Sequence, residues 1–184
     1  MNHSEPAGAR LDGADCSNAR LAWAGLTLVA VFAAYNLEEV SGGGPAGPPA
    51  FVGAGRVRPP AGLYRLDRFA LATVWLTVAV AALFSPSLSG RPPTTRRTAL
   101  RVAAAGALGG NAVGHLALAL VSRRRNPGVV TAPALLVAAV AAATADRRSA
   151  GLPGRTTGLA VGAGLVATVP IIGLALGAAR LLRP

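Results

Sequence analysis

The chain has 184 residues, of which 52% are hydrophobic and only 14% are charged, and its mean hydropathy is +0.49. Because soluble domains carry about 25% charged residues, this composition argues against an ordinary soluble protein. The net charge is +11, and the eighteen basic residues are all arginines in the gaps between apolar runs. Arginines in such gaps are typical of helix-end anchors in a bilayer rather than of a nucleic-acid surface. We therefore predict an all-α polytopic membrane protein whose partner is the lipid bilayer, with no nucleic acid.

The source and the redox chemistry are also constrained by composition. A chain rich in alanine, glycine and arginine indicates a GC-rich genome, which favours a bacterial inner membrane as its location. Cys16 is the single cysteine, so the sequence excludes an internal disulfide and any metal site built from several cysteines.

Residues 1–20 are polar and small, and we predict a disordered tail there. The segment carries acids as well as arginines, unlike the leading part of a signal peptide, so we do not expect cleavage after the first apolar run. Residues 21–184 are predicted to form a single transmembrane helical domain.

Five apolar runs, bounded by arginines or by breaks rich in proline and glycine, predict five transmembrane helices with the two termini on opposite sides of the membrane. The Gly/Pro-rich stretch 41–65 predicts a connecting loop, and Pro170 predicts a kink in the last helix. The two sides carry equal numbers of arginines, which leaves the orientation open. The predicted spans are 21–37, 69–84, 102–121, 128–145 and 156–179.

Glycines recur four residues apart on two of these spans. They are Gly106, Gly110 and Gly114 on the third, and the pairs Gly158–Gly162 and Gly173–Gly177 on the fifth. Such spacing lets helix backbones approach closely in lipid, and we interpret both sets as packing faces.

The first span ends in a polar tip. Tyr35, Glu38 and Glu39 share one helical face, and Asn36 lies among them. The simplest interpretation is a helix end at the membrane interface. Acids at a helix C-terminus, however, lie at the unfavourable end of the helix dipole, which suggests another role.

Asn111 and His115 share a face well inside the third span, where lipid offers no hydrogen-bond partner. Interhelical hydrogen bonds are the alternative to a functional role. With five spans, the first and third helices run the same way, so His115 lies in the half of the membrane that contains the acids. We therefore predict that Glu38 or Glu39 comes within direct or water-bridged reach of His115.

Three motifs in this order, YNLEE, NAVGH and NPGVVTA, resemble the HXXEE family of uncharacterised multi-pass membrane proteins. The resemblance spans roughly residues 21–145. It implies that Glu38, Glu39, Asn111 and His115 are the polar positions of the family. Tyr35 stands where the family's first motif has its histidine, so a metal site that used this histidine would be weakened or lost here.

Three functions remain open from the sequence. One is a membrane scaffold or interaction protein whose polar cluster serves packing. Another is an intramembrane enzyme, in which Glu38, Glu39 and His115 are the catalytic candidates and also the tentative ligands of a divalent metal, supported by the polar side chains of Tyr35, Asn36 and Asn111. The third is a carrier of a proton or small solute. The sequence does not decide whether the protein is an enzyme.

Overall fold

The computed structural model describes residues 8–42, 66–85, 94–123 and 126–182. The described residues form five helices, which confirms the all-α fold. Their bounds are Gly8–Ser41 (α1), Leu66–Phe84 (α2), Thr95–Ser122 (α3), Ala132–Ser149 (α4) and Gly154–Leu182 (α5).

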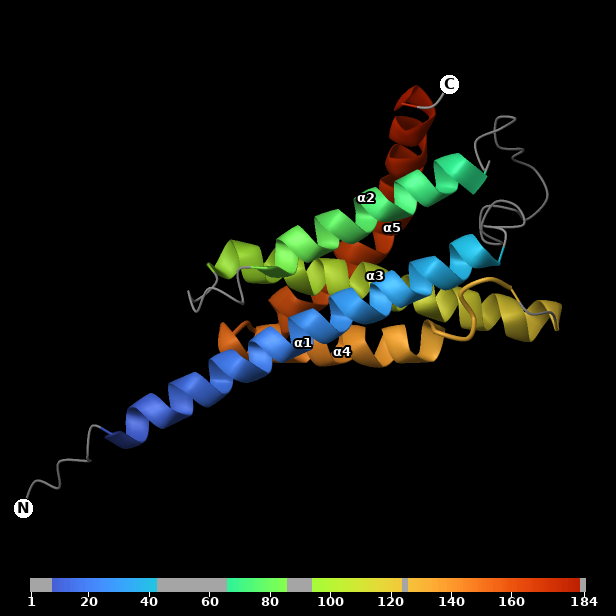
Figure 1. The fold of residues 1–184 in the computed structure, drawn as a ribbon. Coiled ribbons are helices and arrows are strands. Elements are labelled where there is room, and N and C mark those ends of the chain that lie inside the picture. The colour runs from blue at the N-terminus through green and yellow to red at the C-terminus, as the bar shows by residue number, and fades with distance from the viewer. Residues whose placement is uncertain (1–7, 43–65, 86–93, 124–125, 183–184) are drawn as a thin grey trace, which may run out of the picture.

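Successive helices of the bundle alternate in direction (Figure 1). α1 and α3 run the same way, and α2 and α4 run back between the same two ends. α3 packs against α4 and α5, while α1 packs against α4 and α2. The end of α1, the second half of α3 and the start of α4 therefore lie at one end of the bundle, as the sequence predicted.

The first helix is longer than predicted. It begins at Gly8, so residues 8–20 are helical where a disordered tail was expected. Alanine, leucine and arginine, which are strong helix formers, recur through this stretch, and its polar composition does not prevent a helix. α1 ends at Ser41 as expected, and the Gly42 amide donates to the Glu38 carbonyl at 2.9 Å. Most of the predicted loop, residues 43–65, lies outside the described residues.

The prediction of five membrane-spanning helices was wrong. Among the described residues, three helices are long and apolar enough to cross a membrane: Asn18–Ser41, Thr95–Ser122 and Gly154–Leu182. α2 contains a shorter apolar stretch, Arg68–Phe84. α4 has only 18 residues and ends with Asp146, Arg147 and Arg148, so an apolar run shorter than a bilayer core remains.

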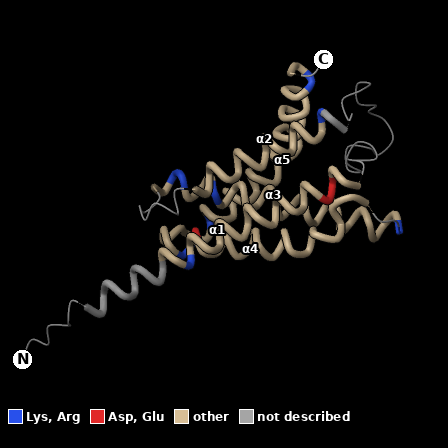
Figure 2. The backbone as a smooth tube through the Cα atoms, in the orientation of Figure 1, with Lys and Arg blue, Asp and Glu red and all other residues tan. Residues whose placement is uncertain are grey.

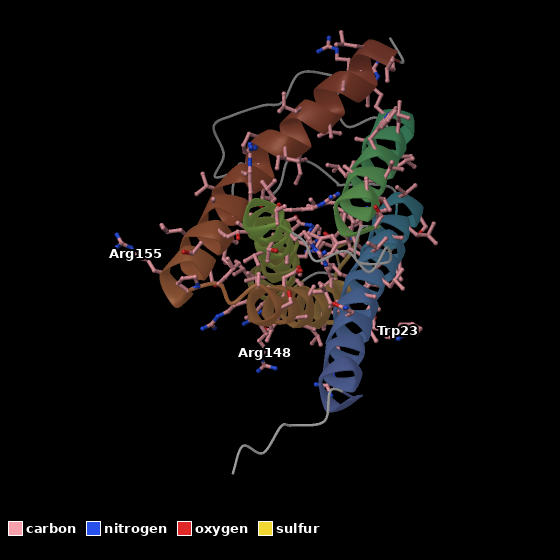
Figure 3. All side chains as sticks on the ribbon, turned by 90° about the vertical axis from the view of Figure 1, so that its left-hand side faces the viewer. Trp23, Arg148 and Arg155 are labelled. Carbon is pink, nitrogen blue, oxygen red and sulfur yellow. The ribbon has the colours of Figure 1, made fainter. Side chains whose placement is uncertain are left out.

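The charged residues lie mainly towards the helix ends (Figure 2). Trp23, Arg148 and Arg155 point away from the bundle (Figure 3). The core joins α1, α3 and α4 with the end of α2, and it is built from alanines and a few larger apolar side chains, including Leu28, Phe32, Phe84, Leu108 and Leu135.

Glycines on α3 allow α5 to pack closely. A Cβ atom at Gly106 would lie 2.9 Å from the Val161 Cα, so any side chain there would force the two helices apart. On α5 the predicted packing face was wrong, because a Cβ at any of its four predicted glycines would meet nothing within 4 Å. Gly164 packs on the α3 backbone instead, and α5 continues as one helix through Pro170. Spacing alone identified the glycine pattern but not the face that is buried.

Candidate functional site

Tyr35 connects the polar tip of α1 to the middle of α3. Its side chain is completely buried, its hydroxyl donates to Glu39 Oε1 at 3.1 Å, and Asn111 Nδ2 donates to the same hydroxyl at 2.8 Å. The Tyr35 ring also stands edge-on to the His115 imidazole, with ring centroids 5.4 Å apart. One phenol thus links both polar pairs that the sequence singled out.

His115 is oriented by the segment that precedes α4. Its Nδ1 lies 2.9 Å from the Pro127 carbonyl oxygen and 3.3 Å from Asn126 Oδ1. Asn126 in turn donates from Nδ2 to the His115 carbonyl at 3.1 Å. Because both neighbours of Nδ1 are acceptors, Nδ1 carries the proton in this arrangement.

The opposite ring nitrogen, His115 Nε2, lies 3.2 Å from Glu39 Oε1. This contact confirms the predicted approach of an acid on α1 to His115. Since Nδ1 already donates to Pro127, the contact between Nε2 and Oε1 holds a single proton, as imidazolium with carboxylate or as imidazole with carboxylic acid.

Glu38 points to a different partner. Its carboxylate accepts hydrogen bonds from the Val130 amide at 3.1 Å, the Thr131 amide at 2.9 Å and the Thr131 hydroxyl at 2.7 Å. These groups form the start of α4, where free amides and the positive end of the helix dipole favour an anion. The unfavourable position of Glu38 at the end of α1 is therefore offset by a favourable one at the start of α4.

Gly128 allows the segment before α4 to pack closely against Tyr35 of α1. Its φ of +88° lies in the left-handed region, and a Cβ there would stand 2.8 Å from Tyr35 Cε2. Glycine meets both demands, because it accepts a positive φ and leaves room for the phenol ring. We call the assembly of Tyr35, Glu38, Glu39, Asn111, His115 and residues 126–131 the polar clasp.

Asn36, predicted as a supporting residue, lies outside the clasp. Its Nδ2 donates to Thr77 Oγ1 of α2 at 2.8 Å, and Thr77 donates to the Thr73 carbonyl within α2. Asn36 therefore ties α1 to α2 rather than to α3.

The clasp does not supply the three-ligand metal set of Glu38, Glu39 and His115 that the sequence allowed. Within the described ranges, no three His, Cys, Asp or Glu side chains gather closely enough to hold a metal ion. Glu39 and His115 meet, but Glu38 is turned away and held by α4. Two ligands remain where structural and catalytic zinc sites use three or four from the protein.

A second buried polar group lies near the other end of α4, and the sequence did not predict it. Arg101 of α3 pairs with Asp146 of α4: Nε donates to Oδ2 at 3.2 Å, and Nη2 lies 3.1 Å from Oδ1. Both side chains are at most 1% exposed, and the guanidinium lies over the Phe84 ring at 4.7 Å. Burial raises the pKa of Asp146 to about 6, and the attraction of Arg101 only partly offsets it.

The pair was missed because the third helix was predicted to begin at residue 102. The helix begins at Thr95, where the Thr94 hydroxyl accepts from the Arg97 amide, so Arg101 lies almost two turns inside it. Opposite charges at the same end of two neighbouring helices were the available signal.

Comparison with known proteins adds one result. The model of the family described as "Protein of unknown function with HXXEE motif" matches residues 26–143, and the chain belongs to this family. No curated protein and no solved structure matches the chain. The matched region contains the whole clasp and ends before Asp146. Tyr35 takes the position of the motif histidine and still joins the network through its hydroxyl.

Proposed function

We propose that this HXXEE protein is a membrane-integral scaffold in which the family motifs close the polar clasp and hold α1 against α3 and α4. We further propose that it lies in the cell membrane of a bacterium. The membrane proposal is supported by three helices long and apolar enough to cross a bilayer.

The observation that carries the scaffold proposal is the internal pairing of the clasp. Among the described residues, buried side-chain polar atoms without a hydrogen bond occur only in Arg101 and Asp146, so the clasp contains none. Buried polar networks in which every member has a partner rigidify a fold and specify one arrangement of its helices. Residues of the three motifs form hydrogen bonds and an ion pair with one another, as expected of a network that fixes the helices relative to one another.

The region between the two buried polar groups argues against a conduit through the bundle. Arg101 and His115 are separated by about 21 Å along α3. Residues 102–110 between them are only valine, alanine, leucine and glycine. Ala105 and Leu108 face a core of apolar side chains from α1 and α4, and Gly106 and Gly110 face Val161 and Leu165 of α5. Protons and ions need polar groups or water along their path, and this stretch of α3 has no polar side chain.

A double-mutant cycle on Tyr35 and Asn111 tests the scaffold proposal. Tyr35→Phe and Asn111→Leu each remove one partner of the 2.8 Å hydrogen bond, and the double variant removes both. We expect a coupling free energy of about 0.5–3 kcal/mol for the unfolding of the protein in detergent. Strictly additive effects would contradict a clasp that holds the two helices together.

The contact between Glu39 and His115 favours a second candidate function, the exchange of a proton at one face of the membrane, as a carrier or an enzyme would require. A carboxyl group and an imidazole that share one proton are a common arrangement in proton transfer. Proteoliposomes with a pH-sensitive dye inside distinguish a proton carrier from the scaffold. Exchange across the membrane predicts a proton flux that Glu39→Gln abolishes, whereas the scaffold predicts equal, background flux for both proteins.

A further inference from the structure

The family motif begins with a histidine, and this chain has Tyr35 there. We propose that the clasp is a latent site for a divalent first-row metal ion, closed in this protein because the Tyr35 hydroxyl occupies the place of the metal. The inference rests on the same clasp as the proposed scaffold, but it concerns what that position can bind.

The first support is the spacing of the polar atoms around Glu39. Two ligand atoms held about 2.1 Å from one tetrahedral metal ion lie about 3.4 Å from each other. His115 Nε2 and Glu39 Oε1 are 3.2 Å apart, close to that separation. The Tyr35 oxygen lies 3.1 Å from the same Glu39 oxygen, so the phenol takes up the space beside Glu39 in which an ion would have to lie.

The second support is the way in which His115 is held. A metal-binding imidazole almost always donates its other N–H to a carbonyl or carboxylate, which fixes the tautomer and turns the free nitrogen towards the metal. His115 Nδ1 lies 2.9 Å from the Pro127 carbonyl, and Nε2 is the nitrogen directed at Glu39. His115 is thus oriented as metal-binding histidines are, although the ligands that would complete a metal site beside it are incomplete.

The missing element is a third ligand, and Tyr35 explains its absence. A neutral phenol is a poor ligand for divalent metals because its reference pKa is near 10. An imidazole at this position is shorter than the phenol, so it would retreat from Glu39 and leave space where the hydroxyl now lies. Two histidines and one carboxylate then form a familiar three-ligand set for a first-row metal. Asn111, which now donates to the Tyr35 oxygen, would face a water molecule bound in the remaining position.

The test is metal binding by the full chain with Tyr35→His, purified without a histidine tag. The background carries His3→Ala and Cys16→Ser, because these are the chain's other histidine and its single cysteine. We expect the Tyr35→His variant to bind about one equivalent of Zn²⁺ and, with Co²⁺, to show the visible absorption bands of a tetrahedral site. The Tyr35 background protein is expected to bind at least tenfold less tightly.

Three control variants make the result specific. Tyr35→Phe removes the hydroxyl without adding a ligand and should bind no more metal than the background. Adding His115→Gln or Glu39→Gln to Tyr35→His should remove the bound equivalent and the cobalt bands. Helix content and thermal unfolding of each variant show whether the fold is retained.

A folded Tyr35→His variant that binds no metal would overturn the inference, and so would binding that survives His115→Gln. Either outcome leaves the scaffold proposal intact, since that proposal depends on the coupling between Tyr35 and Asn111 and not on metal.

Discussion

The two ends of α4 are held by polar groups of different kinds. At its start, the clasp combines a histidine, two carboxylates, a phenol, two side-chain amides and a hydroxyl, and its buried atoms are all hydrogen-bonded. Near the end of α4, Arg101 and Asp146 form a buried ion pair in which Arg101 Nη1 has no hydrogen-bond partner. The clasp distributes charge over many donors and acceptors, whereas the ion pair depends on two groups alone. The two ends should therefore respond differently to substitution.

The largest effect is expected at the ion pair. Asp146→Ala leaves Arg101 charged and buried without a partner, which should lower the free energy of unfolding by about 3–5 kcal/mol. The control is the double variant Arg101→Met/Asp146→Leu, which replaces both charges by apolar groups. It should be about as stable as the original protein, because burying the two charges costs about as much as their attraction returns. Reversible unfolding in mixed detergent measures both, and a double variant as unstable as the single one would contradict this explanation.

The comparison also shows what the sequence could and could not predict. Asn111, His115 and the two acids were identified because polar residues at helical spacing inside apolar runs are rare. Arg101 and Asp146 were not, because an error of seven residues at the start of α3 placed Arg101 outside the helix. The separate roles of Glu38 and Glu39 were not predictable from the sequence. They depend on how closely the start of α4 packs against Tyr35, and Gly128 allows this close packing. The predicted number of membrane-spanning helices was wrong because apolar runs were counted without weighing the short apolar stretch of α2 and the charged end of α4.

The next largest effect is expected at Gly128, within the clasp. Gly128→Ala adds a Cβ at a positive φ and against the Tyr35 ring, and it should destabilise the protein by about 1–3 kcal/mol. Gly151→Ala is the matched control, because Gly151 also has a positive φ, +60°, but a Cβ there would meet nothing within 4 Å. The difference in unfolding midpoint between the two variants isolates the contact with Tyr35. Equal losses would mean that the close approach of α4 to α1 does not matter.

A smaller effect is expected at Glu38. Glu38→Ala removes the carboxylate that accepts from the first amides of α4, and loss of such a cap costs about 0.5–2 kcal/mol. Hydrogen exchange at the Val130 and Thr131 amides should become faster while exchange in the middle of α3 stays unchanged. Ser41→Ala, which removes an exposed hydroxyl that donates to the Glu38 carbonyl, should leave these amides protected. Unchanged protection in Glu38→Ala would show that another group caps α4.

The claim that the family motifs hold the end of α1 against the start of α4 can be tested directly by a disulfide between these two segments. A Cβ built on Gly42 would lie 3.0 Å from the Pro127 Cβ, about 0.5 Å short of the range of roughly 3.5–4.5 Å found in disulfides, so a small shift of the backbone would allow the bond. In a Cys16→Ser background, Gly42→Cys/Pro127→Cys should form a disulfide rapidly in native membranes, and Gly42→Cys/Val137→Cys should not. Adding Tyr35→Phe and Glu38→Ala should slow the first reaction about tenfold. This is the effect expected if the two substitutions weaken the association of α1 with the start of α4 by about 1.4 kcal/mol. Absence of the disulfide, or the same rate after the clasp is removed, would contradict the account.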